Sequence, residues 1–210
     1  INIGAATGPI ATGAAAALWG WHTGFALAAV LMLLALVTYA LGQRHLPEQR
    51  PRAADRPKAA PLDAVQKRKI WVLVAIIAMT IPAEISYPMV WSIGILWVDQ
   101  WVNLASPLGT VPSSWFSSVD SIGSILAAPV LIVLWRWQSA RGSEPVSVTK
   151  IGIGTAIVAV GTMTFVLGNL GHSQPHSVNV LWALAGFLIM GLGWMYYWPT
   201  LLALVSRAAP

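Results

Sequence analysis

The sequence has 210 residues, of which 57% are apolar and only 9% are charged. The mean hydropathy is +0.69 and the apolar residues lie in long blocks, which excludes a soluble globular domain and predicts an all-α integral membrane protein. Twelve basic and seven acidic side chains give a net charge of +5, which we attribute to membrane topology and contact with anionic lipid, not to nucleic-acid binding.

Six apolar blocks are each long enough to cross a hydrocarbon layer, which needs about 20 helical residues. Open strands cannot cross lipid and no block alternates apolar and polar residues, so every block is predicted to be a helix. In chain order the predicted spans cover residues 1–19, 23–42, 70–98, 114–135, 151–170 and 179–205. A proline-rich, charged linker over 46–69 separates the first two helices (1–45) from the last four (70–210).

Every Lys and Arg falls on one side of these predicted spans. The connections near 20–22, 99–113 and 171–178 contain neither residue type. The positive-inside rule therefore places the linker and both ends of the chain in the cytoplasm, and we expect a bacterial inner membrane. The chain starts without Met inside an apolar block, so we also expect it to be an internal part of a longer protein.

Small residues in the first and fifth spans predict close helix contacts. The stretches are GAATG, from Gly4 to Gly8, and IGIGTAIVAVGTMT, from 151 to 164. Such spacing lets two backbones approach each other in a membrane. The first stretch lacks the Gly-Lys-Ser/Thr ending of a phosphate-binding loop, so we predict no nucleotide site and no cofactor.

The third span contains an acid, Glu84, in the segment IPAEISYP. A charge at the bilayer centre costs about 2.5–3.5 kcal/mol, so such residues normally face a bundle interior or a watery cavity. Pro82 and Pro88 each lack a backbone donor, which predicts a kink or break near the acid. Glu84 is either a functional acid or a protonated acid that hydrogen-bonds a neighbouring helix with a structural effect only.

The fourth span also contains an acid, Asp120, within SSWFSSVDSIGSILAAPVLIVLW. Two interpretations are open for it. Asp120 could be the N-cap of a shorter helix over 121–138, whose first amides its carboxylate would accept. It could instead lie inside the span and face a binding cavity.

Most of the tryptophans lie near predicted span ends, where amphipathic rings prefer the headgroup region, but Trp194 and Trp198 lie deeper. His172 and His176 have the spacing HxxxH, but Ser-Gln-Pro separates them in a predicted outside loop, so we predict no metal site. No span pairs a His with a nucleophile, and we expect no enzymatic activity.

Several stretches resemble the proton-dependent oligopeptide transporters, a branch of the major facilitator superfamily. The first two spans, with Asn-x-Gly, a later Gly-Pro and Gly-Trp-x-x-Gly-Phe, are similar to the family's fifth and sixth helices. VPSSWFSSVDSIGSILAAPVLIVLW resembles the eighth helix, and GLGWMYYWPTLLALVSRAAP resembles the tenth. The resemblance implies the major facilitator fold, with helices five to ten of twelve present here.

The resemblance also implies roles for individual residues. Asn2 matches an asparagine that helps to hold the peptide, and Asp120 falls where the family has an asparagine near the peptide's amino terminus. Trp194 replaces the family's glutamate that pairs with the ligand ammonium, and Trp198 replaces the Ser of its Ser-Pro. Asn2, Asp120, Trp194 and Trp198 are therefore the expected substrate-binding residues.

The usual Glu-Gln of the family's seventh helix aligns with Pro88 and Met89, and Glu84 lies one helical turn before them. Glu84 and Asp120 are therefore the candidates for proton coupling, as relocated charges. The resemblance implies a symporter of protons with di- or tripeptides or related small zwitterions. The replacements at 194 and 88 leave an alternative open, a non-transporting membrane scaffold or sensor that retains the fold.

Overall fold

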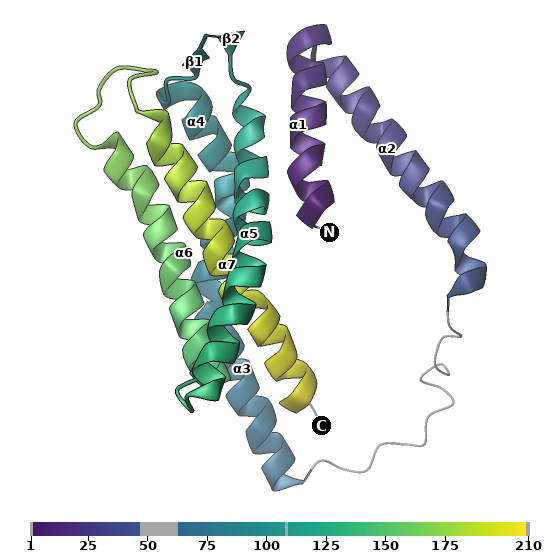
Figure 1. The fold of residues 1–210 in the computed structure, drawn as a ribbon, viewed down its shortest axis with the longest axis vertical. Coiled ribbons are helices and arrows are strands. Elements are labelled where there is room, and N and C mark those ends of the chain that lie inside the picture. Colours follow the sequence, from purple (N-terminus) through teal and green to yellow (C-terminus); the bar gives the residue numbers. More distant parts are fainter. Residues whose placement is uncertain (1, 47–62, 108, 209–210) are drawn as a thin grey trace.

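The computed structural model describes residues 2–46, 63–107 and 109–208, and helices make up nearly all of this part (Figure 1). The α-helices are α1 (Asn2–Trp19), α2 (Trp21–Gly42), α3 (Ala64–Met89), α4 (Ile95–Trp101), α5 (Phe116–Ala140), α6 (Ser147–Asn169) and α7 (Val180–Ala208). Shorter elements are the 3-10 helices η1 (Gln43–His45) and η4 (Ser113–Trp115), the π-helix η3 (Val90–Gly94), and the strands β1 (Ala105–Ser106) and β2 (Gly109–Thr110). The all-α prediction is confirmed.

Five of the six predicted spans are helices long and apolar enough to cross a membrane. They cover Trp21–His45, Ala64–Trp101, Ser113–Ala140, Ser147–Asn169 and Val180–Arg207. The remaining predicted span forms α1, an 18-residue helix rich in Ala and Gly that is not in this set.

The third span differs most from its prediction. It begins at Ala64, because Asp63 accepts the Val65 amide and the Gln66 side chain accepts the Asp63 amide in a capping box. The helix does not break near Glu84, since α3 continues through Pro82 and Pro88 as far as Met89, and the kink expected there stays a prediction. The irregularity comes directly afterwards, where η3 changes the hydrogen-bond spacing before α4.

Glycines bring α6 and α7 into close contact. Gly154 faces Tyr197, Gly161 faces Met190 and Gly168 faces the Trp182 side chain, so that a Cβ added at any of these glycines would lie within 2.8 Å of α7. The seven-residue spacing places all three glycines on one face of α6. The small-residue contact predicted for the fifth span is confirmed.

The GAATG stretch behaves differently. A Cβ added at Gly4 or Gly8 would have no atom within 4 Å among the described residues, so the close contact predicted there stays a prediction. The contact of α1 with the rest of the bundle lies further along, where Gly13 packs against Ser114 and Trp115. Helix α1 contacts η4 and α5.

The three connections without Lys or Arg lie at one end of the bundle, as predicted (Figure 1). Backbone hydrogen bonds of 2.9 Å join two of them, from Asn103 to the Val178 carbonyl and from Val178 to the Trp101 carbonyl. The end of α2, the start of α3, the α5–α6 connection and the end of α7 lie at the other end. Most of the linker predicted over 46–69, namely 47–62, lies outside the described residues.

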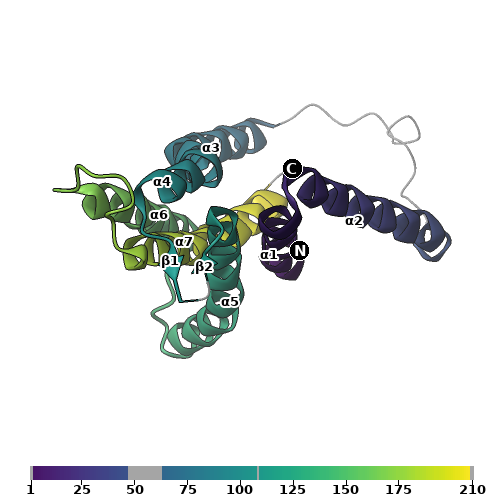
Figure 2. The same cartoon turned by 90° about the horizontal axis from the view of Figure 1, so that it is seen from above.

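The view from above shows the arrangement of the helices in the bundle (Figure 2). Helix α7 contacts α6 and α5 over long stretches and contacts α3 more locally. Helix α1 packs against α5, and α2 packs chiefly against α1. The main core cluster of buried side chains therefore draws on α3, α4, α5, α6 and α7, with Phe187 and Tyr197 fully buried.

Candidate functional site

Two hydrogen bonds between tyrosines and acids join α3, α5 and α7. The Tyr197 hydroxyl on α7 donates to Glu84 Oε1 on α3 at 2.7 Å. The Tyr87 hydroxyl on α3 donates to Asp120 Oδ2 on α5 at 2.8 Å. Glu84 and Tyr87 lie about one turn apart on α3, so this one helix is tied to both of its neighbours.

Asp120 lies inside α5 and not at its start. The helix begins at Phe116 and is preceded by η4, so the N-cap interpretation is wrong. The side chain is only 2% exposed, and its second carboxylate oxygen, Oδ1, has no hydrogen-bond partner among the described residues. Gly191 of α7 packs directly against the Asp120 backbone, where any side chain would collide with the Asp120 carbonyl, and this close approach buries the acid.

Glu84 has a different environment. It is partly exposed and lies in the continuous part of α3. Its hydrogen bond does reach a neighbouring helix, but the phenol of Tyr197 is the donor and the carboxylate is the acceptor. The contact therefore does not require a protonated acid, which the structural interpretation of Glu84 had assumed.

Aromatic rings from α3 and α7 form a stack beside the two acids. Trp194 lies between Tyr87, at a centroid distance of 4.3 Å, and Trp198, at 4.8 Å, with interplanar angles of 12° and 17°. Tyr197 meets Trp194 edge-on at 5.5 Å. We call Glu84, Tyr87, Asp120, Trp194, Tyr197 and Trp198 the acid–aromatic cluster.

The structure thus brings together four of the five predicted site residues, Glu84, Asp120, Trp194 and Trp198. The fifth, Asn2, is the first residue of α1, and its side chain makes no hydrogen bond within the described residues. The roles assigned to these five residues remain predictions.

Sequence reasoning missed Tyr87 and Tyr197, which supply the donor for each acid. One signal was available, because Tyr87 follows Glu84 by three residues and must share its helix face. Tyr197 gave no such signal, since its partner lies 113 positions away in the sequence.

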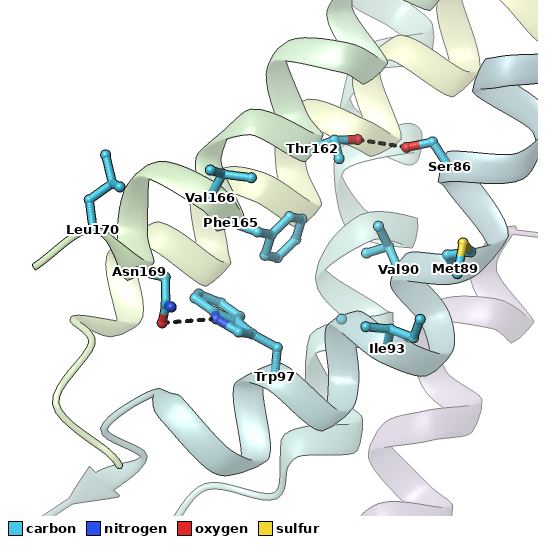
Figure 3. Close-up of a pocket in the computed structure, with 11 residues that line it drawn as sticks. Ser86, Met89, Val90, Ile93, Trp97, Thr162, Phe165, Val166, Asn169 and Leu170 are labelled. Atoms are coloured by element: carbon cyan, nitrogen blue, oxygen red, sulfur yellow. Dashed lines mark hydrogen bonds between the residues drawn. The ribbon is translucent and has the colours of Figure 1, made fainter. Parts of the chain in front are cut away.

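Two cavities lie outside the acid–aromatic cluster. The first, of about 560 Å³, is a largely apolar cleft between α3–α4 and α6 (Figure 3). A Ser86–Thr162 hydrogen bond of 3.0 Å and a Trp97–Asn169 hydrogen bond of 3.4 Å cross it. The second, of about 480 Å³, lies between α1–α2 and the segment 110–114 and includes Asp99.

Within residues 2–46, 63–107 and 109–208, no group of three or more His, Cys, Asp or Glu could hold a metal ion. The chemistry available to the acid–aromatic cluster is therefore that of carboxylates and aromatic faces. A carboxylate can exchange a proton or accept hydrogen bonds from an ammonium group, and an indole face attracts cations.

Comparisons with known proteins agree with this architecture. The family model described as Major Facilitator Superfamily matches residues 1–210. The "Peptide transporter YePEPT" of Yersinia enterocolitica subsp. palearctica serotype O:3 (strain YE-P4) is 30% identical over 102 residues, which cover 48% of this chain and 20% of the relative. The "Uncharacterized transporter YclF" of Bacillus subtilis (strain 168) is 22% identical, in an alignment that covers all of this chain and 53% of the relative.

A solved structure has the same fold. The crystal structure of a mutant of the peptide transporter POT in complex with alafosfalin matches with a TM-score of 0.67 and 20% identity, over all of this chain and 53% of that chain. The present chain thus spans about half the length of that transporter and of YclF, and the part of it that aligns with YePEPT covers a fifth of that protein. These matches agree with the family resemblance of the sequence.

Proposed function

Since the chain belongs to the Major Facilitator Superfamily, we propose that it forms part of a proton-coupled symporter of di- and tripeptides or related small zwitterions. A relative and a solved structure described as peptide transporters support the peptide as the transported class. The observation that carries the proposal is the acid–aromatic cluster. It places two acids within membrane-spanning helices, where an acid is costly and marks an ion or substrate path.

The proposed mechanism uses the charge of a carboxylate as the switch. Proton binding from outside neutralises the acid, so that the helices around it can move without carrying a charge through a low-dielectric region. Release of the proton inside restores the charge. Because α3 is tied to α5 by Tyr87 and to α7 by Glu84, protonation of either acid changes a contact between helices.

We assign the ligand ammonium to Asp120 and the coupling proton to Glu84. A desolvated ammonium needs a carboxylate partner. Trp194 stacks on Tyr87, whose hydroxyl donates to Asp120, and its ring could add a cation–π contact of about 0.5–2 kcal/mol. Glu84 is partly exposed, which suits exchange of protons with water. Trp198 extends the aromatic surface, and Asn2 retains the substrate-binding role that the family resemblance implies.

The proposed membrane arrangement follows the distribution of basic residues. Residues 1–45 are the last two helices of an N-terminal bundle, 46–69 are a cytoplasmic linker and 70–210 are the first four helices of a C-terminal bundle. Both ends of this segment face the cytoplasm, in a bacterial inner membrane. Its partners are the peptide, protons and the lipid bilayer.

The test is reconstitution of the full-length protein in proteoliposomes that contain a pH-sensitive dye. Dialanine added outside should acidify the lumen and accumulate inside when an inward proton gradient is imposed, and a protonophore should abolish the accumulation. Binding of dialanine with no uptake and no acidification would contradict the proposal and favour the alternative of a scaffold or sensor that retains the transporter fold.

A further inference from the structure

The Tyr87–Asp120 hydrogen bond occupies the acid that the proposed function assigns to the substrate ammonium. Tyr87 is 8% exposed and Asp120 is 2% exposed, so the bond is closed to solvent. The phenol has one proton to donate and satisfies Oδ2, while Oδ1 has no partner among the described residues. A buried carboxylate with one free oxygen has capacity for further donors.

The ring of Tyr87 packs against aromatic neighbours. It stacks on Trp194 at 4.3 Å and tilts against Trp91 at 6.3 Å. Three residues further along, η3 replaces the regular helix with a π-helix, a feature that often occurs at functional sites. Tyr87 thus lies at the regular end of α3, next to the irregular segment.

We propose that Tyr87 is a specificity-determining residue that competes with the substrate ammonium for Asp120. The hydroxyl fills the donor position in the empty site, and a free peptide amine replaces it. An ammonium group offers three donors and a positive charge, so it can satisfy both Oδ1 and Oδ2, whereas an acetylated amine offers one neutral N–H. The exchange therefore favours peptides with a free amine.

This inference rests on the proposed role of Asp120, and its alternative is a purely structural bond between α3 and α5. The two differ in what removal of the hydroxyl does. If the bond only ties the helices, its loss affects all ligands alike. If the hydroxyl competes with the ammonium, its loss strengthens binding of free-amine peptides alone.

The experiment measures equilibrium binding of dialanine and N-acetyl-dialanine to the full-length protein in detergent, without a proton gradient. Tyr87→Phe keeps the ring on Trp194 and removes only the hydroxyl. We expect its affinity for dialanine to rise by roughly 10-fold, the effect of one hydrogen bond to a charged group, and its affinity for N-acetyl-dialanine to change little. The ratio of the two affinities is the readout.

Tyr197→Phe is the matched control, because it removes the same group from the other acid. It should leave the ratio at the wild-type value. In an Asp120→Asn background, Tyr87→Phe should no longer change the ratio, because the carboxylate for which the hydroxyl and the ammonium compete is absent. A measurement on the wild-type chain covers the case of a poorly folded variant: dialanine should change its tryptophan fluorescence, because the ring of Tyr87 stacks on Trp194.

The outcomes separate the two proposals. If Asp120→Asn weakens both ligands equally or neither, the assignment of the ammonium to Asp120 is wrong whatever Tyr87 does. If Asp120→Asn weakens dialanine selectively but Tyr87→Phe shifts both ligands by one factor, or shifts neither, the competition is overturned and the bond is structural. An unchanged tryptophan fluorescence on dialanine binding would also count against displacement of Tyr87.

Discussion

Glu84 and Asp120 accept the same kind of hydrogen bond in different surroundings, and the roles proposed for them rest on this difference. Asp120 is buried against Gly191 and needs a ligand or proton to satisfy its second oxygen. Glu84 is partly exposed and can exchange protons without first losing a packed neighbour. A desolvated ion pair depends strongly on both partners, so the buried acid suits recognition and the more accessible acid suits coupling.

A third acid, Glu144, forms an ion pair with Lys150 at the connection between α5 and α6. Lys150 is 8% exposed, donates to Glu144 and lies 4.2 Å from the centroid of the Trp135 ring. The hydrogen bond from Lys150, with a second from Ser139, lowers the pKa of Glu144 below its ordinary value. Glu144 lies in the connection between α5 and α6, outside the spans.

The lowered pKa of Glu144 predicts an acid-dependent loss of stability. A carboxyl whose pKa is lower in the folded state stabilises the fold above its unfolded pKa of about 4.3, and this contribution is lost as the pH falls through the lower, folded pKa. Thermal unfolding of the purified protein from pH 7 to pH 3 should show this loss. Glu144→Gln and Lys150→Met should both show a flatter pH dependence over the acid range, and a slope equal to that of wild type would contradict the pair's contribution.

Helix packing at the element scale depends on the glycines of α6. Gly161 meets Met190 of α7, and a Cβ there would lie 2.5 Å from the Met190 side chain and 3.1 Å from its backbone nitrogen. Backbone atoms cannot move aside as a flexible side chain can. The two helices must therefore separate if this glycine is enlarged.

Gly161→Leu should lower the free energy of unfolding by about 1–3 kcal/mol or more, because the added side chain forces α6 away from α7. Gly152→Leu is the matched control, because Gly152 lies on the same helix with no atom within 4 Å of an added Cβ. Thermal unfolding of both variants in one detergent makes the comparison. Equal losses of stability at the two positions would show that the α6–α7 contact is looser than described.

The position of the π-helix after Pro88 could not be predicted from the sequence. A proline removes one backbone hydrogen bond of a helix. The resulting irregularity can occur at the proline itself or in the residues that follow it. Here α3 continues through both prolines and the change appears at Val90–Gly94. The prolines thus indicated an irregular third span but not its position.

At the scale of the whole molecule, the distribution of Lys and Arg predicts the orientation in the membrane. Ser106 is the last residue of the exposed strand β1 and Ser143 lies in the exposed α5–α6 connection, at opposite ends of the bundle (Figure 1). The sequence contains no cysteine, so single cysteines introduced into it can be labelled without background from these 210 residues.

Ser106→Cys should react with a membrane-impermeant maleimide in intact cells. Ser143→Cys should react only after the membrane is permeabilised, because the loop with Arg141 is expected inside. Labelling is read by mass shift or fluorescence on a gel, with full permeabilisation as the control for access. Labelling of Ser143→Cys in intact cells would contradict the predicted orientation.

Much of the architecture could be predicted from the sequence because lipid imposes strong constraints. The hydrocarbon layer fixes the length and apolar character of a span, and the six helices lie close to their predicted ranges. The superfamily prediction is confirmed by the family model over residues 1–210.

The contacts of the site could not be predicted to the same extent. Asp120 was identified, but its position inside α5 depends on where the helix starts, which is the least certain feature of a predicted helix. The Tyr197 donor to Glu84 comes from a helix 113 residues away, and only tertiary packing brings it there.

The central claim is that an acid within the membrane couples proton movement to peptide transport, and Glu84→Gln tests it most directly. Proteoliposomes of the full-length protein are assayed for dialanine accumulation driven by a proton gradient and for counterflow exchange of dialanine without a gradient. Asp99→Asn, which alters an exposed acid of α4 outside the acid–aromatic cluster, is the matched control and should behave as wild type in both assays.

Glu84→Gln should abolish the proton-driven accumulation and spare counterflow, because exchange needs binding and conformational change but no net proton movement. Proton-driven accumulation at the wild-type level in Glu84→Gln would contradict the account.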